Sequence, residues 1–111
     1  MEILKSLDSA PFINSYDVID YKTFGLGFYI KIKVILKDKS ELHIKEYFNI
    51  NERNYSYHWQ SEQGTTIIRG DNAPHHRNIT TYPHHRRESN SVVASNEITI
   101  AEILSHIEKR I

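Results

Sequence analysis

Cysteine is absent from the 111 residues of this chain. Disulfide bonds, iron–sulfur clusters, cysteine-ligated zinc sites and thiol nucleophiles are therefore excluded, together with small secreted proteins built on a disulfide framework. An excess of charge of either sign is also lacking, because 14 Lys and Arg balance 14 Asp and Glu. A net charge of zero disfavours binding to nucleic acid or membranes by bulk electrostatic attraction, but it leaves room for a local basic patch.

Long hydrophobic runs are missing too. No apolar stretch approaches the ~20 residues of a membrane-spanning helix, and the N-terminus lacks the apolar core of a signal peptide. We therefore expect a cytoplasmic protein. The length fits a single domain over residues 1–111, and 39% hydrophobic with 25% charged residues is typical of a globular chain.

Alternation of apolar and polar residues predicts an antiparallel sheet. The clearest strand is predicted at 29–37, where apolar residues occupy every second position from Ile30 to Leu36 and lysines lie between them. The same pattern predicts further strands at 12–23, 41–48, 53–60 and 65–69. The short connections favour a β-meander, since parallel pairs need long crossovers.

Helices are expected at both ends of the chain. The segment MEILKSLDS predicts a short helix that Pro11 would end. Near the C-terminus, Thr99 and Glu102 have the spacing of a capping box. An apolar stripe follows, at Ile100, Leu104, Ile107 and Ile111. We predict an α+β fold in which an antiparallel β-meander of about five strands is covered on its apolar face by the C-terminal helix.

A segment of different character precedes that helix. Residues 70–91 contain two prolines and little periodicity, so we expect a long loop or extended arm. Basic and titratable residues are concentrated here, because residues 69–87 hold four arginines, one aspartate and four of the seven histidines. These histidines form two adjacent pairs, His75–His76 and His84–His85.

Three interpretations of these histidines remain open. Imidazole is a common metal ligand, but adjacent histidines on an extended chain point in opposite directions, so each pair supplies one ligand where zinc needs three or four. We therefore assign no metal and no cofactor. Cleavage of RNA through its own 2′-hydroxyl needs a base, an acid and cations for the phosphorane, which histidine, arginine and lysine supply. In a purely structural role, the histidines would bond to the loop backbone.

Further candidates lie on the predicted strands. In the segment YSYHW at 55–59 the three aromatic residues share a face, and we expect them in the core rather than stacked on bases. His58 then lies on the opposite face, near His43 and Lys45.

Two acidic residues are also notable. Glu46 stands in register with apolar residues, which indicates an ion pair with Arg53 or Arg69. Asp71 either orients a histidine, as carboxylates do in catalytic triads, or caps a turn with Asn72.

Four short motifs follow one another between Glu46 and Arg87. They are Glu46-Tyr47, Tyr55-Ser56-Tyr57-His58-Trp59, Ile68-Arg69-x-Asp71-Asn72-Ala73-Pro74-His75-His76 and Pro83-His84-His85. In this order they resemble the TumE-type toxin family of prokaryotic toxin–antitoxin modules. A further histidine often closes the family's last motif, and Arg87 stands at that position here. The resemblance implies a bacterial or archaeal toxin whose partner is a DNA-binding antitoxin.

From the residues we predict that such a toxin acts on RNA as a metal-independent endoribonuclease. Its candidate catalytic residues are His58, Asp71, His75, His76, His84 and His85, with Asp71 as the orienting group. Its candidate phosphate contacts are Lys45, Arg69 and Arg86. Two alternatives stay open: a toxin that transfers a nucleotidyl or other group to tRNA or protein, and a non-enzymatic module that binds RNA, a metal or a partner.

Overall fold

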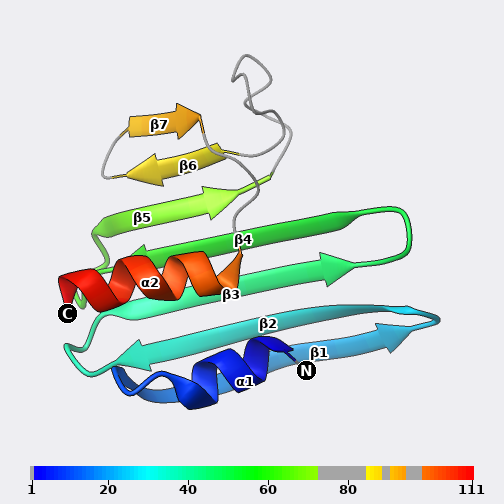
Figure 1. Ribbon diagram of the computed structural model, residues 1–111, viewed down its shortest axis with the longest axis horizontal. Coiled ribbons are helices and arrows are strands. Elements are labelled where there is room, and N and C mark those ends of the chain that lie inside the picture. The colour runs from blue at the N-terminus through cyan, green and yellow to red at the C-terminus, as the bar shows by residue number, and fades with distance from the viewer. Residues whose placement is uncertain (1, 73–84, 89–90, 95–98) are drawn as a thin grey trace.

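The computed structural model describes residues 2–72, 85–88, 91–94 and 99–111. Within these ranges the chain forms two helices and a seven-stranded antiparallel sheet in which each strand lies beside the next one in sequence (Figure 1). The elements are α1 (Glu2–Ser9), β1 (Ile13–Phe24), β2 (Gly27–Leu36), β3 (Glu41–Phe48), β4 (Arg53–Gln60), β5 (Thr66–Asp71), β6 (His85–Glu88), β7 (Ser91–Ala94) and α2 (Ile100–Arg110). The predicted α+β meander with a C-terminal helix is confirmed.

The sheet is larger than the five strands predicted. Residues 85–88 were expected in a loop or arm, but they form β6, which pairs with β5 and then with β7. The sequence of β6, HRRE, has no apolar residue and hence none of the alternation that marks a half-buried strand. Its pairing rests on backbone hydrogen bonds, which any side chain allows.

One face of the sheet is apolar and is covered by both helices (Figure 1). In β2 the buried residues alternate strictly with more exposed ones from Ile30 to Leu36, as predicted. Helix α1 adds Ile3 and Leu7 to this core, at the i and i+4 spacing of one helix face. The opposite face of the sheet is left to the polar residues of each strand. No helix in the described part of the chain is long and apolar enough to cross a membrane.

Helix α2 begins as its sequence predicts, and its buried face matches the predicted apolar stripe at Leu104 and Ile107, while Ile100 is partly buried and Ile103 is buried in addition. The Thr99 hydroxyl accepts a hydrogen bond from the backbone N–H of Glu102 at 3.3 Å, which caps the helix. Its buried residues are Ile103, Leu104 and Ile107. Ile111, predicted as the end of the apolar stripe, is 48% exposed because the helix ends at Arg110.

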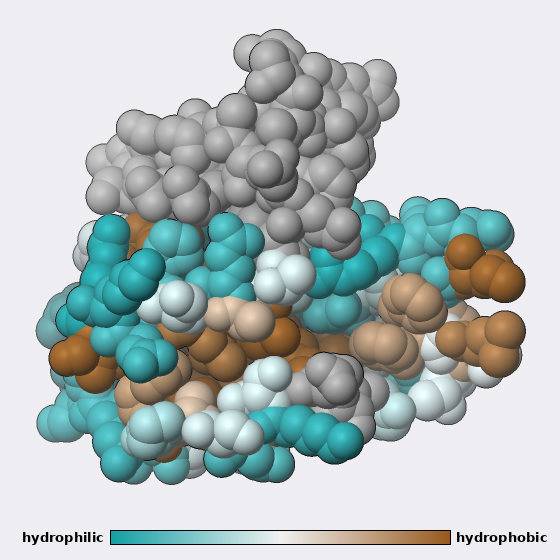
Figure 2. Space-filling model, viewed as in Figure 1, coloured by the Kyte–Doolittle hydropathy of each residue, from teal (hydrophilic) through white to brown (hydrophobic). Residues whose placement is uncertain are grey.

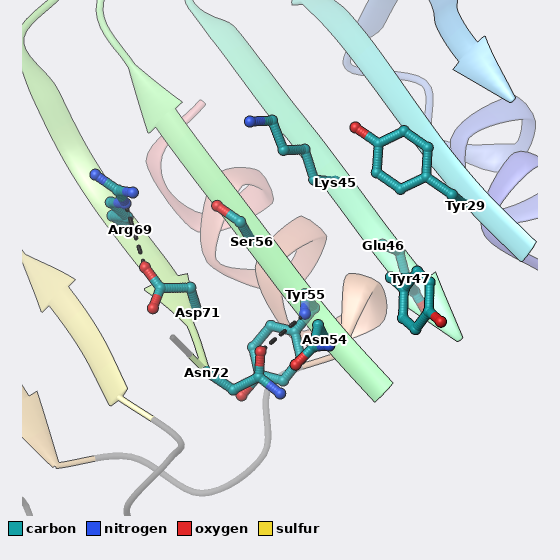
Figure 3. Close-up of a pocket in the computed structure, with 10 residues that line it drawn as sticks. All are labelled: Tyr29, Lys45, Glu46, Tyr47, Asn54, Tyr55, Ser56, Arg69, Asp71 and Asn72. Carbon is teal, nitrogen blue, oxygen red and sulfur yellow. Dashed lines mark hydrogen bonds and ion pairs between the residues drawn. The ribbon is translucent and has the colours of Figure 1, made fainter. Parts of the chain in front are cut away.

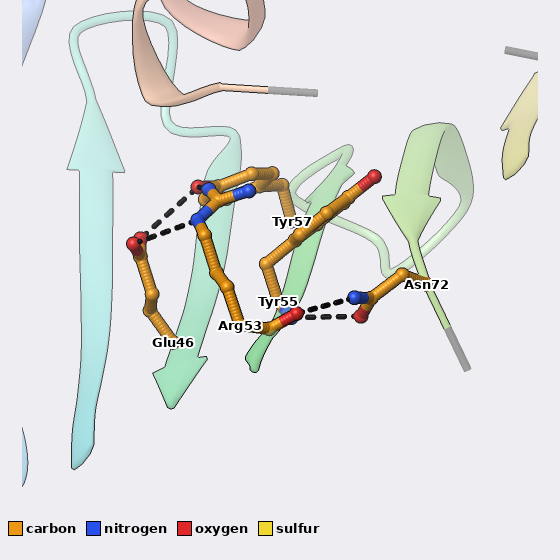
Figure 4. Close-up of polar contacts among 5 residues, drawn as sticks. All are labelled: Glu46, Arg53, Tyr55, Tyr57 and Asn72. Carbon is orange, nitrogen blue, oxygen red and sulfur yellow. Dashed lines mark hydrogen bonds and ion pairs between the residues drawn. The ribbon is translucent and has the colours of Figure 1, made fainter. Parts of the chain in front are cut away.

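A polar cluster of Glu46, Arg53 and Tyr57 joins β3 to β4 (Figure 4). The Nε of Arg53 lies 3.2 Å from Oε1 of Glu46, so the predicted ion pair is present. The Tyr57 hydroxyl accepts from the Arg53 guanidinium at 2.8 Å and donates to Oε2 of Glu46 at 3.1 Å. Burial, and then the negative charge of Glu46, raise the pKa of Tyr57 above its ordinary value.

Asn72 fastens the end of β5 to β4 (Figure 4). Its Oδ1 accepts from the backbone N–H of Tyr55 at 2.9 Å, and its Nδ2 donates to the carbonyl of Arg53 at 2.6 Å. The amide thus replaces two backbone partners where the strand pairing stops. The sequence predicts only a turn-capping role for this residue, because it does not show how near β4 comes.

Asn72→Ala is expected to lower the free energy of unfolding by about 1–3 kcal/mol, because a buried N–H and a carbonyl of β4 lose their partners. Chemical denaturation measures the change. Asn54→Ala is the control: Asn54 is exposed on the same strand, and its loss should cost less than about 0.5 kcal/mol. Equal losses in the two variants would contradict the fastening role of Asn72.

Alkaline pH should destabilise the protein through Tyr57. The unfolded chain ionises this hydroxyl near pH 10, whereas the fold holds it neutral, so its contribution to stability is full below about pH 10 and falls as the pH rises above it. Tyr57→Phe should be less stable at neutral pH by about 1–2 kcal/mol from its lost hydrogen bonds. Its deficit relative to wild type should shrink in alkaline denaturation curves, and a constant deficit would contradict this.

Candidate functional site

The polar face of β2–β5 is organised in three cross-strand rows. Antiparallel partners lie opposite each other and point to the same face, so the register brings the members of each row together. We call them the tyrosine row (Tyr29, Tyr47, Asn54), the lysine row (Lys31, Lys45, Ser56, Asp71) and the histidine row (Lys33, His43, His58, Arg69). Neighbouring rows are two residues apart along each strand, or roughly 7 Å.

The rows line a groove. A pocket of about 590 Å³ lies over the tyrosine and lysine rows, and a second of about 310 Å³ lies over the lysine and histidine rows. Lys45, Ser56 and Arg69 line both pockets, so the two adjoin, and we call them together the polar-face groove. Figure 3 shows these three side chains, with that of Tyr29, on the four neighbouring strands β5 to β2.

Two imidazoles meet in the histidine row. The ring centroids of His43 and His58 are 6.3 Å apart, and both residues line the smaller pocket. The Nε2 of His43 lies 3.1 Å from Oε1 of Glu41, and the Nε2 of His58 lies 2.9 Å from the Thr66 hydroxyl. Each ring is thus oriented by a neighbouring side chain. The predicted position of His58, opposite the aromatic core residues and near His43, is confirmed.

Arg69 and Asp71 form the β5 side of the groove. The Nε of Arg69 lies 3.3 Å from Oδ2 of Asp71, within ion-pair distance, although this buried N–H makes no hydrogen bond of good geometry with a described residue. The Asp71 side chain is 5% exposed and that of Arg69 is 43% exposed. A buried carboxylate needs a counter-charge, so Asp71 holds the base of the guanidinium in place while its outer part reaches the groove.

The structure describes only some of the other residues that the sequence predicts for the site. The sequence predicts that Asp71 either orients a histidine or caps a turn; the structure shows its ion pair with Arg69, and the orienting role stays a prediction. His75, His76 and His84 lie outside the described residues. His85 and Arg86 are described as part of the β6 backbone, where His85 stands opposite Asp71 and Arg86 opposite Gly70.

His43 is missing from the residues predicted as catalytic. The signal that could have found it is register: a short turn between two alternating strands sets His43 opposite His58. Ser56, Tyr29 and Tyr47 were missed for the same reason. Each is unremarkable alone, and only pairing places it beside the cations.

The groove keeps an excess of positive charge although the chain is neutral. Lys31, Lys45 and Arg69 line its two pockets, and of the carboxylates there Asp71 is paired with Arg69 and Glu46 with Arg53. Lys33, in the histidine row, lies 3.6 Å from Glu41 and lines neither pocket. In the part of the chain that the structure describes, no three His, Asp or Glu residues are placed to share a metal ion. Cations beside two oriented imidazoles suit a phosphodiester, whose charge the cations neutralise while imidazole transfers protons.

Comparison with known proteins gives one finding. A family model described as "Toxin TumE" matches residues 3–111. No curated protein and no solved structure matches the chain.

Proposed function

This chain belongs to the TumE toxin family, and from that premise we propose that it is a metal-independent endoribonuclease. The resemblance predicted from the motifs between Glu46 and Arg87 is confirmed and extends over nearly the whole chain. The protein is therefore the toxin component of a toxin–antitoxin module, with an antitoxin as partner. We further propose that this antitoxin binds DNA and that the toxin acts in the cytoplasm.

The observation that carries the nuclease proposal is the pair His43 and His58 beside Lys45 and Arg69. One imidazole takes the proton of a ribose 2′-hydroxyl, and the 2′-oxygen then attacks phosphorus. The other protonates the 5′-oxygen as its bond to phosphorus breaks, which leaves a 2′,3′-cyclic phosphate and a 5′-hydroxyl. The separation of 6.3 Å between ring centroids suits groups that each reach one oxygen of a phosphate over hydrogen bonds of roughly 2.6–3.2 Å.

Lys45 and Arg69 supply the positive charge for this reaction. Both line the two pockets, so a phosphate held between them lies next to the imidazoles. The charge of the pentacoordinate phosphorus is greater than that of the diester, and fixed cations stabilise it without reorganisation. Asp71 acts as the positioning residue of Arg69.

The remaining candidates stay part of the proposal. His75, His76, His84 and His85 are further candidates for acid–base roles, and Arg86 for a phosphate contact. The pairing of β6 with β5 brings the backbone of His85 and Arg86 beside the strand that carries Arg69.

Purified protein should cleave labelled single-stranded RNA in the presence of EDTA and leave 2′,3′-cyclic phosphate ends. His43→Ala and His58→Ala should each lower the rate about 100- to 10,000-fold, the usual contribution of one acid or base. His106→Ala is the matched control, because His106 lies on α2, against the opposite face of the sheet. Its rate should equal that of wild type.

The acid and the base are distinguished with an RNA whose scissile 5′-oxygen is replaced by sulfur, since a thiolate leaves without protonation. The variant that lacks the acid should regain activity on this substrate, and the variant that lacks the base should not. Cleavage that needs a divalent ion contradicts the metal-independent mechanism. The double variants His75→Ala/His76→Ala and His84→Ala/His85→Ala test the other histidines. If activity is lost only in one of these, the catalytic histidines do not lie in the histidine row.

Expression without the antitoxin should stop growth, and Lys45→Ala together with His58→Ala should relieve this inhibition. Lys5→Ala, on α1, is the control and should remain toxic. Colony counts after induction measure the effect, alongside immunoblots that check for equal protein levels. A double variant as toxic as wild type would show that toxicity does not depend on the polar-face groove.

A further inference from the structure

The larger pocket has aromatic side chains that neither the core nor the histidine chemistry uses. Tyr29 and Tyr47 lie on the polar face, are partly exposed, and line this pocket of about 590 Å³ with Asn54. Pockets of a few hundred Å³ with apolar walls and few polar groups are typical of small organic ligands. Lys45 and Arg69 line the same pocket, so an aromatic ring here offers a stacking face beside charged contacts.

Tyr47 is fixed before any ligand arrives. Its ring stacks on Phe24 with centroids 5.5 Å apart, and its hydroxyl accepts a hydrogen bond from Nδ2 of Asn49 at 3.0 Å. Gly27 makes the stack possible, because a Cβ there would lie 2.7 Å from the Phe24 ring and would clash with the Phe48 carbonyl. A ring held in this way loses little conformational entropy when a ligand stacks on it.

The three rows follow a fixed order along each strand. On β3 the order is Tyr47, then Lys45, then His43. The strand thus presents an aromatic ring, a cation and an imidazole at steps of roughly 7 Å. A ligand with a flat ring on the tyrosine row therefore has its next anionic group over Lys45 and Arg69, beside the imidazoles. A nucleotide has a flat base and a phosphate in this order.

We propose that Tyr29 and Tyr47 form a nucleobase subsite that stacks one unpaired base next to the phosphate bound by Lys45 and Arg69, so that the substrate is single-stranded RNA. The identification of the ligand as RNA rests on the proposed function. A base inside a duplex has both faces covered by its neighbours, so it cannot stack on a protein ring unless it is released. The subsite therefore selects single strands over duplexes.

Binding tests this subsite independently of cleavage. The probe is a fluorescent single-stranded oligoribonucleotide with 2′-O-methyl groups throughout, which has no hydroxyl to attack phosphorus. Tyr29→Leu should weaken binding about tenfold, as expected for the loss of one stacked base. Tyr29→Phe keeps the ring and should bind like wild type. Tyr21→Leu, at an exposed tyrosine of β1 outside the pocket, should do the same.

The second arm of the experiment measures the binding of a series of probes, each of which lacks the base at one position. At one position, loss of the base should weaken binding to wild type about as much as Tyr29→Leu does. The same loss should not weaken binding to the Tyr29→Leu variant any further. Duplex of the same sequence should bind wild type less tightly and should not respond to Tyr29→Leu. The wild-type half of this arm needs no variant, so an abasic effect that is equal at every position of the probe contradicts the subsite even if the leucine variant does not fold.

Two results would overturn the subsite. One is unchanged binding of the single strand by Tyr29→Leu, and the other is an abasic effect that is the same in both proteins at every position. If Tyr29→Leu cleaves RNA with wild-type KM and kcat, the subsite fails while the nuclease proposal stands. If the probe binds as expected but no RNA is cleaved, the subsite stands and the nuclease proposal fails.

Discussion

The register between β3 and β4 is the constraint on which the site depends. It pairs Leu42 with Trp59 and, one position along, His43 with His58. Side chains alternate between faces, so the pairing that buries Trp59 also sets the two imidazoles together on the polar face. A slip of one residue would turn His58 into the core and Trp59 into solvent. Burial of the apolar face therefore maintains the geometry of the site on the polar face, although no apolar core residue takes part in the site.

Polar contacts within the core select this register more sharply than apolar burial can. The indole N–H of Trp59 donates to the hydroxyl of Ser40 at 2.9 Å, and Ser40 is 3% exposed. Glu46 and Arg53 form an ion pair across the same two strands. Apolar side chains tolerate many neighbours, but each of these polar groups loses its partner in any other register, at a cost that is largest for the buried Trp59 and Ser40.

The parts of the fold that follow from local alternation could be predicted from the sequence, and the parts that follow from pairing could not. The positions of strands β1 to β5 follow from alternation in the sequence, and in β2, β3 and β4 burial alternates with it, whereas β1 has no buried residue. The pairing of His58 with Arg69 depends on an irregularity between Trp59 and Gln60, which shifts β5 by one residue. Without this shift, Gln60 opposite Thr66 would bring Ile68, not Arg69, opposite His58. No local pattern in the sequence marks that residue.

The candidate site shows the same division. The sequence predicts a partner for Glu46 because a lone charge among apolar residues needs one, and it places His58 on the polar face by counting along one strand. It places His43 near His58 without giving it a catalytic role, and it assigns no role to Tyr29 or Tyr47 in the groove, because these roles depend on rows that cross strands.

Charge separation explains how a chain of zero net charge can present a basic groove. Both helices lie on the apolar face, so the opposite face of β2–β5 keeps its lysines at fixed spacing. Figure 2 shows the helix-covered side, where hydrophilic residues surround an apolar band. On the polar face Asp71 is buried against Arg69 and balances its charge, so Lys31 and Lys45 supply the excess of positive charge in the groove. Affinity for a polyanion then depends on local spacing, which net charge does not report.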